Sequence, residues 1–143
     1  MPSIKHAITI DAPLERIYPL VSSGRGFGQW WAADITEVSA DSVELGFFNR
    51  TTIYRLQRIR SAAPTEVEWL CTSGKEWKDT RLVFRLSPSK TGAQLQFSHA
   101  DWRSETDYFV SCNTTWGELM FRLKAAAEGK TPGPLFTKDG LGY

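Results

Sequence analysis

The chain has 143 residues, with 17 basic and 16 acidic side chains, so it is long enough for one domain with a substantial core. This balance of charge argues against nucleic acid or a membrane surface as a partner bound by bulk electrostatics. No apolar run approaches the roughly 20 residues that a spanning helix needs, so we expect no membrane insertion. Without a signal peptide, the chain is expected to be cytoplasmic, with Cys71 and Cys112 as buried, reduced thiols.

The first third of the chain predicts one strand followed by two short helices. Ile4, His6, Ile8 and Ile10 occupy alternate positions, which is typical of a half-buried strand. We expect Asp11 to cap the next helix, with Pro13 in its first turn and an apolar stripe that ends at Val21. The segment GRGFGQWWA, residues 24–32, predicts a second helix that is short at best.

Residues 35–99 predict an antiparallel meander. Turn signals separate strands that we expect at Ile35–Val38, Val43–Phe48, Thr52–Ile59, Val67–Cys71, Leu82–Leu86 and Leu95–His99. Alternate side chains of each strand share one face. Within Thr52–Ile59 the inward face is ambiguous. We favour Tyr54 and Leu56 as the inward pair, because Arg55 and Gln57 then point to water.

The last regular element is a long amphipathic helix that ends near residue 129. Its apolar residues recur at steps of three and four, namely Phe109, Cys112, Trp116, Leu119, Met120, Leu123 and Ala127. A helix with this wide stripe must lie on the sheet, and a cavity can remain between them. We expect a single domain over residues 1–130 and a tail over 131–143, part of which docks through Leu135, Phe136, Leu141 and Tyr143.

Four segments, in this order and spacing, resemble one family: ITIDAPLERIYPLV, GFGQWWA, LQFSHADW and TTWGELMFRLKAAAEG. Over about residues 3–129 the chain is similar to the START/Bet v 1-like (SRPBCC) superfamily, in the branch related to the C-terminal domain of the activator of Hsp90 ATPase. The resemblance implies an α+β helix-grip fold. In that fold a curved, seven-stranded antiparallel sheet wraps around the long C-terminal helix, two short helices follow the first strand, and a deep apolar pocket lies between sheet and helix.

Inward-facing side chains are the candidate ligand contacts. They are Trp30, Trp31, Phe47, Tyr54, Trp69, Cys71, Phe84, Phe97, His99, Phe109, Cys112, Trp116 and Leu119. His99 is the main polar member of this set. It could orient a polar group of the ligand, act as an acid or base, or be a core histidine bonded to Asp101, Tyr54 or a helix side chain. Because the first and last strands are neighbours in this fold, His6 could also approach His99.

Three functions remain open on these residues. We favour a protein that binds a small apolar or aromatic molecule, such as a lipid, a sterol or a polyketide-like compound. The resemblance also allows an enzyme of the polyketide cyclase, aromatase or hydrolase type, with His99 as its acid or base. A chaperone-interacting domain is the third. We expect no cofactor and no metal, because His6, His99, Cys71 and Cys112 lack metal-ligand spacing, and we expect a monomer or a homodimer.

Overall fold

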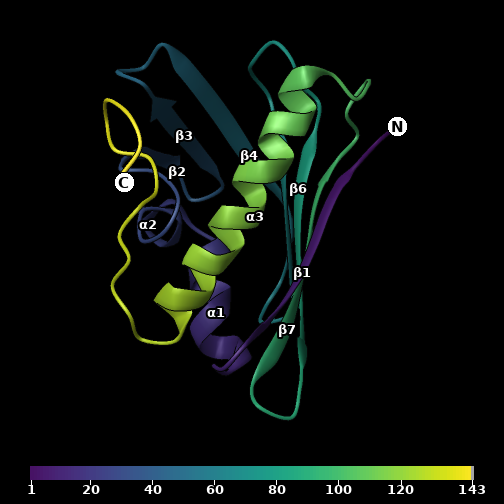
Figure 1. Ribbon diagram of the computed structural model, residues 1–143, viewed down its shortest axis with the longest axis vertical. Helices are drawn as coiled ribbons and strands as arrows, with labels where there is room; N and C mark the ends of the chain where they lie inside the picture. Colours follow the sequence, from purple (N-terminus) through teal and green to yellow (C-terminus); the bar gives the residue numbers. More distant parts are fainter. Residues whose placement is uncertain (143) are drawn as a thin grey trace.

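The computed structural model describes residues 1–142. Its elements are β1 (Ile4–Ile10), α1 (Leu14–Val21), α2 (Gly24–Phe27), β2 (Asp34–Ser39), β3 (Ser42–Phe47), β4 (Thr52–Ala62), β5 (Glu66–Cys71), β6 (Arg81–Pro88), β7 (Ala93–Ala100) and α3 (Asp107–Ala127). Within these residues seven strands form one antiparallel sheet in the order β1-β7-β6-β5-β4-β3-β2. Figure 1 shows α3 crossing one face of the sheet, with α1 and α2 beside it. The predicted helix-grip fold is confirmed.

Strand parity places the core as the sequence predicts. Tyr54 and Leu56 are buried on the inner face of β4, whereas Arg55 and Gln57 are exposed. The terminal strands β1 and β7 pair, with Ile4 opposite His99 and His6 opposite Phe97. His6 therefore lies one pair further along the inner face than His99. These positions follow from strand geometry: successive side chains alternate between the two faces of the sheet, and residues that pair directly share a face.

Helix α1 differs from the prediction at its first residue and ends in an unexpected way. Asp11 is not its cap: Pro13 takes that position without a side-chain bond, and the Asp11 N–H donates to Glu128 Oε2 at 2.8 Å. At the other end, the indole N–H of Trp30 donates to the Leu20 carbonyl at 2.8 Å. The indole N–H of Trp69 donates to the Val21 carbonyl at 2.9 Å. Two tryptophans from outside the helix thus satisfy carbonyls that its last turn would leave free.

The tail after α3 runs back along α2 towards β3, as the yellow segment of Figure 1 shows. The Phe136 N–H donates to the Trp31 carbonyl at 2.9 Å, and the Phe136 carbonyl accepts from the Ala33 N–H at 2.9 Å. Leu135 is buried, Phe136 is half-buried, and Leu141 is exposed. The predicted docking residue Tyr143 lies outside the described residues. Across residues 1–142, no helix has both the length and the apolar character to cross a membrane.

Candidate functional site

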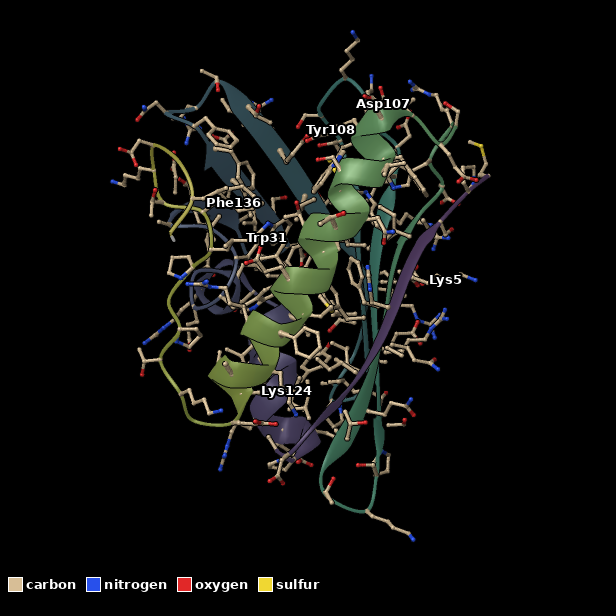
Figure 2. The ribbon with its side chains drawn as sticks, viewed as in Figure 1. Lys5, Trp31, Asp107, Tyr108, Lys124 and Phe136 are labelled. Atoms are coloured by element: carbon tan, nitrogen blue, oxygen red, sulfur yellow. The ribbon has the colours of Figure 1, made fainter. Side chains whose placement is uncertain are left out.

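A cavity of about 280 Å³ lies between the first half of α3, the hairpin of β3 and β4, the segment after α2, the β5–β6 loop and the tail. Figure 2 labels three of its lining residues, Trp31, Tyr108 and Phe136, which come from three different segments. The lining consists of Trp31, Phe47, Phe48, Thr52, Tyr54, Trp77, Tyr108, Ser111, Cys112, Thr115, Trp116, Glu118, Leu119, Leu135, Phe136 and Leu141. The tail is therefore part of the wall.

Aromatic rings form most of the apolar surface of the cavity. Trp77 stacks on Tyr54, with ring centroids 3.9 Å apart and planes at 7°. The ring of Trp116 lies nearly parallel to that of Trp77, with centroids 6.1 Å apart and planes at 19°. It also contacts the ring of Trp31, with centroids 5.0 Å apart. On the tail side Phe136 meets Phe47 edge-on, with centroids 5.0 Å apart. Walls of this kind offer large, flat contact areas to another ring.

Hydroxyl and thiol groups gather at one end of the cavity. Thr106 caps α3 by accepting the Phe109 N–H at 3.2 Å, which fixes Tyr108 in the first turn of the helix. The hydroxyls of Tyr108 and Tyr54 lie 2.5 Å apart, so one donates to the other. Burial raises the pKa of Tyr108 to about 12 and also raises the pKa of Tyr54. The thiol of Cys112, on the same wall, has its pKa raised by burial as well.

His99 lies behind the aromatic walls and is fully buried. The Trp116 indole N–H donates to His99 Nδ1 at 3.1 Å, so Nε2 carries the proton and donates to Thr80 Oγ1 at 2.8 Å. Thr80 Oγ1 in turn donates to the carbonyl of Trp77 at 2.5 Å. Burial lowers the pKa of His99 to about 3. His99 is a neutral core histidine, bonded to the helix side chain of Trp116 and not to Asp101 or Tyr54.

The structure brings part of the predicted contact set to the cavity and leaves part of it in the core. The predicted residues on the wall are Trp31, Phe47, Tyr54, Cys112, Trp116 and Leu119. Those outside it are Trp30, Trp69, Cys71, Phe84, Phe97, His99 and Phe109. Side chains fill the centre of the space between sheet and helix. Phe27 of α2 packs on Trp69, with ring centroids 5.3 Å apart, and Trp77 packs on His99, with ring centroids 4.5 Å apart.

Sequence reasoning missed several wall residues that lie outside regular elements. Trp77 belongs to the loop between β5 and β6, where no periodicity indicates which way a side chain faces. Leu135, Phe136 and Leu141 were expected to dock, but nothing in the sequence connected them with the cavity. An isolated tryptophan in a polar turn is the one signal that could have drawn attention to Trp77. Within residues 1–142, no cluster of histidine, cysteine and acidic side chains could hold a metal ion.

The sequence matches neither a protein-family model nor a curated protein. Among solved structures, the chain is similar to the Aha1 dimer from Colwellia psychrerythraea, with a TM-score of 0.80, 26% identity and coverage of 90% of this chain and 98% of that one. An AHSA1-like protein from Aeromonas hydrophila aligns with a TM-score of 0.66 and 12% identity, covering 90% of this chain and 94% of its own.

DynU16, a putative protein in the dynemicin biosynthetic locus, aligns with a TM-score of 0.72 and 12% identity over 92% of this chain and 49% of its own. At 12% identity the second and third structures share the fold alone, whereas the first also shares about a quarter of its residues with this chain. The resemblance seen in the sequence is confirmed: the chain shares the helix-grip fold of these structures, and it is similar to the Aha1 protein in sequence as well as in fold.

Proposed function

We propose that this protein binds a small apolar or aromatic molecule in the cavity between α3, the sheet and the tail. The observation that carries the proposal is the cavity itself, of about 280 Å³, with the rings of Trp31, Trp77 and Trp116 on its walls. Small-molecule sites in proteins are concave and mostly apolar, with a few polar groups that orient the ligand. The tyrosine pair at one end supplies such groups.

Binding fits the site better than proton transfer at His99. Both ring nitrogens of His99 are engaged by Trp116 and Thr80, and its side chain is not on the cavity wall. A general acid or base must reach the proton that it transfers, directly or through one water molecule. Tyr54, Tyr108 and Cys112 do reach the cavity, but burial raises the pKa of each, which keeps all three protonated at neutral pH.

Titration with naphthalene, followed by quenching of tryptophan fluorescence, tests the proposal. Trp31, Trp77 and Trp116 line the cavity, so a ring bound there should quench the signal. The variant Thr115→Phe places a large side chain on the wall and should abolish binding. Thr114→Phe is the matched control, because Thr114 is exposed on the same helix and does not line the cavity. Circular dichroism checks that both variants fold.

Equal quenching of the wild type and Thr115→Phe would overturn the proposal, because the ligand would then lie elsewhere. Absence of quenching, together with no retained molecule in native mass spectrometry of freshly purified protein, would also overturn it. That second result would favour the protein-interaction role that the Aha1-like branch suggests.

A further inference from the structure

We propose that the cavity selects an uncharged aromatic molecule of two fused rings that carries one hydroxyl group, and that it rejects a carboxylate of the same size. This inference rests on the proposed function and specifies its ligand. Three observations support it: the volume of the cavity, the lack of a cationic side chain among its described lining residues, and the hydroxyl pair formed by Tyr54 and Tyr108.

The volume sets the number of rings. An apolar cavity of about 150 Å³ is known to hold one benzene molecule. The present cavity, at about 280 Å³, is close to twice that size, which corresponds to two fused rings. A sterol or a long acyl chain exceeds this volume. The wall consists largely of the flat rings of Trp31, Trp77 and Trp116, which favour a flat aromatic molecule over a branched aliphatic one.

The charge on the wall decides against an anion. Among the described residues, the lining contains no lysine, arginine or histidine that could pair with a carboxylate, and its one charged side chain is Glu118. A buried carboxylate without a cationic partner is costly, and a like charge nearby adds repulsion. The basic side chains of the β3–β4 hairpin that are nearest to its turn are already engaged: Arg50 pairs with Asp34 and Glu44, and Arg55 pairs with Glu44.

The two tyrosine hydroxyls explain the preference for a hydroxyl group. Within the pair, one hydroxyl donates to the other, so the second O–H, which lies beside the Cys112 thiol, and the remaining oxygen lone pairs can turn to a ligand. A ligand hydroxyl can both accept from that O–H and donate to a lone pair. An ether oxygen can only accept, and an unsubstituted ring can do neither.

Isothermal titration calorimetry with matched probes at neutral pH tests the inference, using 2-naphthol, 2-methoxynaphthalene, naphthalene and 2-naphthoate. The full-length protein should bind 2-naphthol about 3- to 10-fold more tightly than naphthalene, the gain of about one hydrogen bond. The ether should fall between them, and 2-naphthoate should bind weakest. Tyr108→Phe should lower the affinity for 2-naphthol towards that of naphthalene without changing the affinity for naphthalene. Glu118→Gln should raise the affinity for 2-naphthoate.

The outcomes separate this inference from the proposed function. If naphthalene binds but 2-naphthoate binds as tightly as 2-naphthol, the inference is wrong and the binding function stands. The same conclusion follows if Tyr108→Phe weakens all the probes equally, because the hydroxyl then has no selective role. If no probe binds, the proposed function and the inference both fail.

Discussion

The indole N–H of Trp116 donates to Nδ1 of His99 over 3.1 Å, which joins a wall of the cavity to a buried residue of β7. On its other side His99 donates to Thr80, which donates to the backbone carbonyl of Trp77, and the Trp77 ring packs edge-on against the imidazole, so one neutral imidazole contacts two residues whose rings face the cavity. A polar residue in this place is tolerated because each ring nitrogen has a partner. His99 therefore links β7 to the aromatic wall of the cavity.

The stability of the fold should depend on pH through His99. Its pKa is lowered from 6.5 to about 3 in the folded protein, so between these values the unfolded chain binds a proton that the folded chain does not. The free energy of unfolding should therefore be at its full value above pH 6.5 and fall as the pH drops, by about 1.5–2 kcal/mol between pH 6.5 and about pH 5.

Chemical denaturation at these two pH values measures the effect. The window lies above the ordinary carboxyl range, and the pKa values of Glu44 and Glu128 are lowered further by their ion pairs with Arg55 and Lys124. His99→Asn should lower stability at neutral pH and remove the pH dependence in this window. His6→Asn is the control and should keep it. An unchanged slope in His99→Asn would show that another group titrates.

Gly26 should not accept a side chain. A Cβ there would overlap the backbone of α1, coming to 2.7 Å from Leu20 Cα and even closer to the Pro19 carbonyl. Because backbone atoms cannot rotate away, Gly26→Ala should destabilise the protein by about 3 kcal/mol or more. Gly28→Ala is the matched control, since its nearest neighbour would be at 3.5 Å, and it should change stability by less than about 1 kcal/mol. Thermal denaturation compares the two, and equal losses would contradict this packing.

The indole N–H of Trp69 should contribute to stability through the end of α1. Trp69→Phe keeps a ring in the core but leaves the Val21 carbonyl without its donor, at a cost of about 1–3 kcal/mol beyond the loss of ring area. Trp102→Phe is the control, because Trp102 is equally buried and its Nε1 has no partner within residues 1–142. Denaturation with urea should give the larger loss for Trp69→Phe. Similar losses would mean that the bond adds nothing measurable.

The tail should depend on Arg122 for its position. The Arg122 guanidinium donates to the carbonyls of Pro132 and Gly133, at 2.8 and 3.0 Å. Arg122→Gln should remove this attachment and increase the rate of trypsin cleavage after the exposed Lys130 several-fold, because cleavage requires the segment to leave the surface. Lys124→Gln, which affects the Glu128 pair instead, is a control without this effect. No change in the rate for Arg122→Gln would mean that Leu135 and Phe136 hold the tail unaided.

Much of the fold follows from the sequence because periodicity records burial. The period of two, together with the polar side chains of Arg55 and Gln57, placed Tyr54 and Leu56 inward. The steps of three and four identified the face of α3 that carries Trp116 and Leu119. These are local rules: they need only the neighbours of a residue along one element. For the same reason they found the inward-facing wall residues of the strands and α3, such as Phe47 and Trp116, but missed the more polar ones, which are Thr52, Tyr108, Ser111, Thr115 and Glu118.

The position of the cavity was decided by the tertiary structure alone. A cavity is the space that side chains from distant segments fail to fill, and here Phe27, Trp77 and the tail determine where that space remains. The same holds for His99: its sequence position indicated burial and left Asp101, Tyr54 and a helix side chain open as partners, and the structure decided for Trp116 and added Thr80. Strand parity fixes the direction of a side chain, whereas its contacts depend on where a loop, a tail and a helix meet it in space.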